Sequence, residues 1–159
     1  MKASIFTLLL ISLIFSATPA YTQELSDLEN SCDTYYDIEN SLRCGYQSYI
    51  RKFALPYCQE YLRRHDSFSP AGQVVAKGIR ACLQQELLAN LYENPDLSCN
   101  NIQSIGIRSH YKCYIEAGFC ELPNPDLVLI MWIAKRQVFN AEIMATFMDV
   151  VGYCQRGSP

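Results

Sequence analysis

Eight cysteines constrain the fold of this chain more than any other feature of its sequence. They form an even set within 159 residues, and an even set in a short exported chain usually makes disulfides rather than reactive thiols. A disulfide forms only where the fold brings two Cα atoms within about 7 Å, so the intervals between the cysteines carry information about the fold. The eight are Cys32, Cys44, Cys58, Cys82, Cys99, Cys113, Cys120 and Cys154.

The first 20 residues have the pattern of a secretory signal peptide. Lys2 provides a positive start, and residues 5–15 form an apolar run that suits a signal peptide and is too short to span a bilayer. Small side chains at Thr18 and Ala20 fit a cleavage site after Ala20. We therefore expect a secreted, extracellular protein with a single domain over residues 21–159 and no membrane insertion.

The charge balance argues against nucleic acid as a partner. The formal net charge is −3, and it becomes −4 when the signal peptide is removed, because Lys2 is the only charged residue lost. A mildly acidic chain without a dense cluster of Lys and Arg is poorly suited to bind phosphates or an anionic membrane surface. We expect neither as a partner.

The spacing of the apolar residues predicts an all-α fold, a small disulfide-stapled domain of four or five helices. One helix is expected over residues 32–44, and a second begins near residue 46 and is interrupted at Pro56. The clearest helix begins at Ser69, which can cap it, and ends at Asn94, because the residue before a proline avoids the α region.

Two further helices are expected in the second half of the chain. One covers residues 100–116 and stops at Gly118. The last covers residues 127–154, with a break allowed near Asn140. It opens with the apolar run 127–134, which is only eight residues long and predicts a buried helix segment rather than a membrane span.

The sequence offers little chemistry for catalysis. His65 and Asp66 are similar to the His-Asp pair of secreted phospholipases A2, but those enzymes also have adjacent cysteines and a glycine-rich calcium loop, which this sequence lacks. His110 is the only other histidine, so no zinc site is expected. A Ser/His/Asp triad assembles from distant residues and stays open, although no Gly-x-Ser-x-Gly motif is present. We expect no enzymatic activity, no metal and no cofactor.

Eleven tyrosines are an unusual feature of the composition. Several fall early in the predicted mature chain, and tyrosine combines a large contact area with a polar tip. The candidates for a surface that contacts a protein partner are Tyr35, Tyr36, Tyr46 and Tyr49. The alternative, in which the tyrosines form a half-buried face of a small core, stays open.

The cysteine intervals carry a family likeness together with the residues inside them. The stretches between consecutive cysteines contain 23, 13, 6 and 33 residues for the pairs 58/82, 99/113, 113/120 and 120/154. The first contains QEYLRRHDSFSPAGQVVAKGIRA, the second NNIQSIGIRSHYK, followed by Cys-Tyr, and the third the short step YIEAGF. This ordered run resembles the stanniocalcins, which are secreted glycoprotein hormones, over residues 58–154.

The resemblance implies a disulfide pairing. Two bridges follow from matching spacings, Cys82–Cys113 and Cys120–Cys154. The other four cysteines would most naturally pair as Cys32–Cys58 and Cys44–Cys99, although this N-terminal pairing stays open. The family carries further N-terminal cysteines, an intermolecular cysteine in a longer C-terminal region and an N-glycan. This sequence lacks those cysteines and has no ordinary glycosylation sequon, so any homodimer is expected to be non-covalent.

The resemblance also implies a function. We expect a hormone-like regulatory protein with a role in calcium and phosphate homeostasis, acting on a receptor or inhibiting a pappalysin-type metalloproteinase. The alternative is a secreted helical protein that binds lipid or a small apolar ligand, in the manner of saposins or plant lipid-transfer proteins. Their cysteine patterns differ from the present one. A third class, a small hydrolase of the phospholipase A2 kind, depends on His65 alone.

Overall fold

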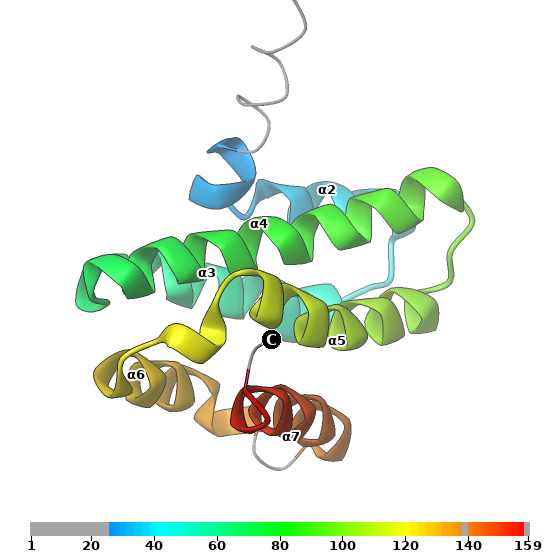
Figure 1. Ribbon diagram of the computed structural model, residues 1–159. Helices are drawn as coiled ribbons and strands as arrows, with labels where there is room; N and C mark the ends of the chain where they lie inside the picture. Colours follow the sequence, from blue (N-terminus) through cyan, green and yellow to red (C-terminus); the bar gives the residue numbers. More distant parts are fainter. Residues whose placement is uncertain (1–25, 138–139, 158–159) are drawn as a thin grey trace, which may run out of the picture.

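The computed structural model describes residues 26–137 and 140–157, and the predicted signal peptide lies outside them. The predicted all-α, disulfide-stapled fold is confirmed, because every regular element of the described residues is helical (Figure 1). A helical turn over residues 26–30 comes first. The α-helices are α2 (Asp33–Leu42), α3 (Leu55–Arg63), α4 (Pro70–Glu93), α5 (Cys99–Glu116), α6 (Asn124–Ala134) and α7 (Ala141–Gln155). The shorter elements are the π-helix η1 (Ile50–Ala54) and the 3-10 helices η2 (His65–Ser67), η3 (Phe119–Glu121) and η4 (Lys135–Gln137).

The described residues thus contain six longer α-helices, α2–α7, against the four or five expected. The difference arises at Asn140, whose side chain accepts hydrogen bonds from the backbone N–H groups of Glu142 and Ile143 at 3.1 and 3.2 Å. This N-cap begins α7 and divides the predicted last helix in two. Pro56, expected to interrupt a helix, instead lies in the first turn of α3, a position that tolerates its missing N–H.

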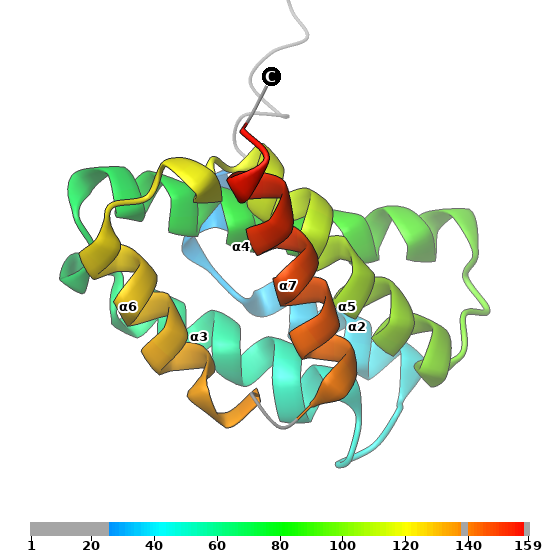
Figure 2. The ribbon, with the colours of Figure 1, turned by 60° about the horizontal axis from the view of Figure 1, so that its bottom comes forward.

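An antiparallel hairpin of α4 and α5 forms the centre of the fold (Figure 1, Figure 2). α5 packs against α4 on one side and against α7 on another, while α2 packs against α4 and η1. α6 packs against α3. The ends of α4 follow the sequence prediction, because Ser69 caps its start and Asn94 follows its last residue. Gly118, which follows α5, has a positive φ of 87° and ends that helix as expected.

Four disulfides use all eight cysteines and connect these helices. Their Cα–Cα distances are 5.2–6.0 Å, within the usual range for a disulfide. The bridges are Cys32–Cys58 between the start of α2 and α3, Cys44–Cys99 between the loop after α2 and α5, Cys82–Cys113 between α4 and α5, and Cys120–Cys154 between η3 and α7. Cys82–Cys113 and Cys120–Cys154 are the two pairs that the stanniocalcin resemblance implies, and the structure joins the other four cysteines in the pairing that the sequence left open. α6 is the one helix among α2–α7 without a bridge.

The hydrophobic core has two clusters arranged along the α4–α5 hairpin. One cluster brings together side chains of α4, η3, α6 and α7, including Val75, Ile130 and Val150. The other joins α2, η1, α3 and the opposite ends of the hairpin helices, and it includes Ile38 and Leu87. Burial of these side chains provides the main driving force for packing the helices together.

A buried carboxylate connects the starts of α4 and α6. Asp126 of α6 is 2% exposed and accepts hydrogen bonds from the backbone N–H of Ser69 at 2.9 Å and from its hydroxyl. The Ser69 hydroxyl oxygen in turn accepts from the N–H of Gly72 at 3.1 Å. A Cβ on Gly72 would lie only 2.6 Å from Cγ of Asp126, so this position requires glycine for the carboxylate to approach.

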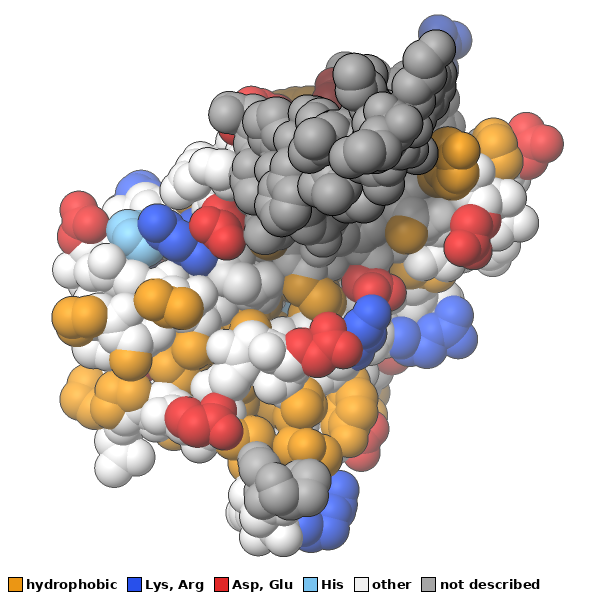
Figure 3. Space-filling view, turned by 45° about the horizontal axis from the view of Figure 1, so that its top comes forward, with side chains coloured by type: hydrophobic (Ala, Val, Ile, Leu, Met, Phe, Trp, Pro, Cys, Tyr) orange, Lys and Arg blue, Asp and Glu red, His pale blue; other side chains and the backbone are white. Residues whose placement is uncertain are grey.

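The surface carries mixed charge. Figure 3 shows acidic, basic and hydrophobic side chains interspersed over the described part of one face, without a large patch of a single charge. Among the described residues, no helix is both long enough and apolar enough to cross a membrane.

Candidate functional site

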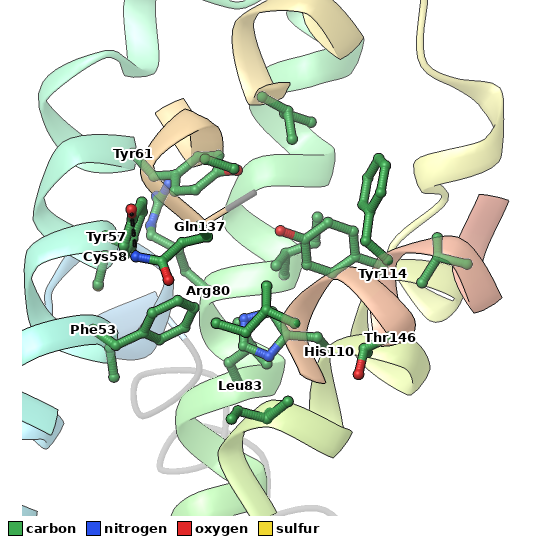
Figure 4. Close-up of a pocket in the computed structure, with 18 of the residues that line it drawn as sticks. Phe53, Tyr57, Cys58, Tyr61, Arg80, Leu83, His110, Tyr114, Gln137 and Thr146 are labelled. Carbon is green, nitrogen blue, oxygen red and sulfur yellow. Dashed lines mark hydrogen bonds between the residues drawn. The ribbon is translucent and has the colours of Figure 1, made fainter. Parts of the chain in front are cut away.

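A cavity lies where α3, α4, α5, α6 and α7 converge, and residues of both core clusters line it. Its volume is about 110 Å³. An apolar cavity of about 150 Å³ binds benzene, so the space here suits a small ligand. Figure 4 shows lining side chains of η1 and α3 on one side and of α5 and α7 on the other.

Aromatic rings of η1, α3 and α5 contribute to the wall of the cavity. The ring centroid of Phe53 lies 4.9 Å from that of Tyr57 and 5.8 Å from that of His110. His110 lies 5.8 Å from Tyr114. Burial raises the pKa of Tyr61 and Tyr114 above the ordinary value, so both phenols keep their protons at neutral pH. These two phenols therefore add no charge to the wall.

Two hydrogen bonds orient polar side chains beside these rings. His110 Nδ1 lies 2.7 Å from the backbone carbonyl oxygen of Gly106. A carbonyl oxygen can only accept, so Nδ1 carries the proton and Nε2 keeps a lone pair. Burial lowers the pKa of His110, which favours the neutral ring. Gln137, the last residue of η4, donates from Nε2 to the Tyr57 hydroxyl at 2.8 Å (Figure 4).

Among the described residues that line the cavity, Arg80 is the one with a charged side chain. It is 3% exposed, and its Nη2 donates to the backbone carbonyl oxygen of Glu29 at 2.6 Å. Its Nε and Nη1 are buried and have no hydrogen-bond partner within the described residues. Burial lowers the pKa of Arg80, and the Glu29 carboxylate opposes this shift. A guanidinium nevertheless keeps its charge in proteins, so the cavity has a cationic wall.

The four tyrosines predicted to form a contact surface do not share one. Tyr35 is 4% exposed, which corrects the prediction for this residue. The reason is its register in α2, where Tyr35 and Ile38 are three residues apart and face the core. Tyr49 is half-buried and packs over Gly106, so a Cβ on that glycine would lie 2.5 Å from the tyrosine ring. Only Tyr36 and Tyr46 are exposed, at 47% and 72%.

The outer face of α6 is an exposed apolar surface that the sequence prediction missed. The run 127–134 was expected to be buried, but Val128, Met131 and Trp132 are 68%, 44% and 43% exposed. Two cations flank the indole of Trp132, because Arg64 and Lys135 each lie 4.0 Å from its ring centroid. A helix packed on one side only buries one face, even when its sequence is apolar all round.

His65 and Asp66, the pair compared with phospholipases A2, lie in the 3-10 helix η2. Neither lines the cavity. Within the described residues, no group of three His, Cys, Asp or Glu side chains is arranged to hold a metal ion.

Sequence reasoning missed Arg80 and His110 as cavity residues. One signal was available for Arg80: it lies four residues after Ala76 in α4, so it shares a helix face with an apolar position. A charged residue on such a face has to be buried with a partner or placed beside a cavity.

No protein-family model matches this chain, and neither a curated protein nor a solved structure matches it. The arguments for its function therefore rest on its own residues and on the stanniocalcin resemblance.

Proposed function

We propose that this protein is a secreted, non-enzymatic regulator of the stanniocalcin type that acts by binding an extracellular protein partner. The observation that carries the proposal is the pairing of Cys82 with Cys113 and of Cys120 with Cys154, the two bridges that the resemblance implies. Such a disulfide framework is typical of an oxidising, extracellular environment. The resemblance points to calcium and phosphate homeostasis and to inhibition of a pappalysin-type metalloproteinase.

The outer face of α6, defined by Val128, Met131 and Trp132, is the surface that best fits the partner. Exposed tryptophan and arginine are the residue types that most often dominate binding energy at protein interfaces. Arg64 and Lys135 flank the indole, and because Arg64 is also paired with Glu60, Lys135 provides the net positive charge beside this apolar centre. It therefore complements a proteinase surface that presents carboxylates around an apolar depression.

The experiment measures cleavage of a growth-factor-binding protein by a pappalysin-type metalloproteinase with purified protein added. We expect inhibition by the wild-type protein and its loss in Trp132→Ala. Tyr46→Ala is the matched control, because Tyr46 is also an exposed aromatic residue beside a cation, with Lys52 Nζ 3.7 Å from its ring centroid. Unchanged cleavage at micromolar wild-type protein removes the inhibitor proposal. Loss of inhibition in Tyr46→Ala alone would move the contact surface to the exposed tyrosines.

The cavity favours a second function, the binding of a small apolar ligand. Its volume of about 110 Å³ and its largely aromatic and aliphatic lining are the observations that support this function. Native mass spectrometry of the folded protein, followed by solvent extraction, tests for a ligand that copurifies. A bound apolar molecule supports this function. If the folded protein binds no apolar probe up to the limit of the probe's solubility, this function is contradicted.

A further inference from the structure

We infer that the basic pair Lys135-Arg136 is a processing site, where a serine proteinase with acidic specificity pockets cuts the chain directly after Arg136. Cys120–Cys154 holds the two resulting chains together. The inference goes beyond the function proposed above. It shares with that function only the expectation that the protein is exported, so that it meets such proteinases during or after secretion.

The sequence contains three pairs of adjacent basic residues, Arg51-Lys52, Arg63-Arg64 and Lys135-Arg136. A trypsin-like serine proteinase binds the basic side chain before the scissile bond through an aspartate in its S1 pocket. A second acidic pocket extends this recognition to a pair of basic residues. The basic side chains must be accessible, and the backbone around the bond must open locally to enter the active site. These two requirements distinguish the three pairs.

The first two pairs are held by a helix and by ion pairs. Arg51-Lys52 lies in η1, which continues directly into α3, and Nε of Arg51 lies 3.2 Å from Oε1 of Glu39. Arg63-Arg64 lies at the end of α3, where both guanidinium groups bind the carboxylate of Glu60. Cleavage after either pair would require these ion pairs to break together with the helix around them.

Lys135-Arg136 lies in a segment that opens more easily. Both side chains are exposed, and they belong to η4, a 3-10 helix of three residues between α6 and α7. The hydrogen bonds of a 3-10 helix have poorer geometry than those of an α-helix, so this short turn opens more readily than the interior of α3 or α4. Figure 1 and Figure 2 show the end of α6 and the start of α7 at the lower edge of the molecule.

The contacts of this segment leave the two basic side chains available. Neither Lys135 nor Arg136 forms an ion pair among the residues that the structure describes. Nζ of Lys135 lies 4.0 Å from the ring centroid of Trp132, a contact that is weak at an exposed site. Gln137 donates to the Tyr57 hydroxyl at 2.8 Å, but this residue lies on the other side of the scissile bond.

The reaction is the hydrolysis of one peptide bond. One water molecule is consumed, the C–N bond between Arg136 and Gln137 breaks, and the products carry a carboxylate on Arg136 and an ammonium group on Gln137. Arg136 lies inside the loop that Cys120–Cys154 closes, so the chain that contains α7 is not released. The cut lies just after α6, which carries Trp132, so the intact and cut forms differ beside the surface proposed to contact the partner.

The test uses kexin, a subtilisin-type endoproteinase that cuts after Lys-Arg and Arg-Arg pairs, on the folded, oxidised protein at neutral pH. Mass spectrometry before and after reduction locates the cut. We expect one cut, after Arg136, and a product that gains the mass of one water and separates into two chains only on reduction. The reduced and alkylated protein should be cut after both Arg64 and Arg136, because the fold no longer protects the first of these sites.

Two variants complete the test. Arg136→Gln removes the side chain that the S1 pocket binds and should slow the cut by about tenfold or more. Arg63→Gln, the matched control in the other pair, should be cut after Arg136 at the wild-type rate. Circular dichroism checks that both variants are folded.

Two results would overturn the inference. One is a folded wild-type protein that is cut after Arg64 as fast as after Arg136. The other is a folded protein that resists kexin while the reduced protein is cut. Neither result depends on the metalloproteinase assay, so the inference and the proposed function can fail separately.

Discussion

Replacing Gly72 by alanine tests the contact between α4 and α6. The added Cβ would lie 2.6 Å from Cγ of Asp126 and would also clash with one of its oxygens, so the carboxylate has to move. Asp126 is 2% exposed and accepts two hydrogen bonds from Ser69. Each hydrogen bond to a charged group contributes about 1.5–3 kcal/mol. Alanine has a higher helix propensity than glycine, and this difference offsets about 1 kcal/mol of the loss. We expect a net loss of about 2–5 kcal/mol in the free energy of unfolding.

Urea denaturation followed by far-UV circular dichroism measures this loss. The matched control is Gly152→Ala in α7, where the nearest atom to the new Cβ is Nη1 of Arg156 at 3.5 Å, an ordinary contact. This control should stabilise the protein by about 0.5–1 kcal/mol. In an Asp126→Ala background the clash is gone, so Gly72→Ala should no longer destabilise. Wild-type stability of the single variant Gly72→Ala would refute the close contact between α4 and α6.

Two further predictions concern the disulfides and the buried histidine. Loops of 26–55 residues are closed by the four bridges, and chain-entropy models credit each with about 3–4 kcal/mol against a total stability of about 5–15 kcal/mol. The reduced protein should therefore be largely unfolded, and a reduced melting curve that matches the oxidised one contradicts this. The lowered pKa of His110 means that the unfolded chain takes up a proton before the folded one does as the pH falls below about 6.5. The free energy of unfolding should therefore fall as the pH drops below about 6.5, and less steeply in His110→Gln. An equal dependence of the free energy of unfolding on pH in the two proteins would refute a buried, neutral His110.

The helices and their ends could be predicted from the sequence because local signals determine them. Ser69 caps α4 through its own side chain, and Gly118 adopts the positive φ that ends α5. The sequence allowed a break at Asn140 but did not require one. An asparagine can either cap a new helix or lie within a continuous one, and its side-chain hydrogen bonds decide between the two. Two disulfide pairs, Cys82–Cys113 and Cys120–Cys154, came from the family resemblance rather than from physical reasoning about the chain, and the pairing of the other four cysteines stayed open.

The cavity and the exposed surfaces could not be predicted, because they depend on how whole helices pack. Tyr35 and Tyr36 are chemically identical neighbours, and only the register of α2 against the core separates a buried ring from an exposed one. The apolar run of α6 gives no sign of which face remains exposed. Arg80 resembles a solvent-facing charge until the packing of the helices around α4 encloses it.

The disulfide framework is the basis of both the fold and the proposed function, and peptide mapping under non-reducing conditions tests it most directly. Digestion and mass spectrometry should identify four linked peptide pairs, Cys32–Cys58, Cys44–Cys99, Cys82–Cys113 and Cys120–Cys154. A Cys113–Cys120 bridge would contradict the account, because it would remove both links that hold α4 to α5 and η3 to α7.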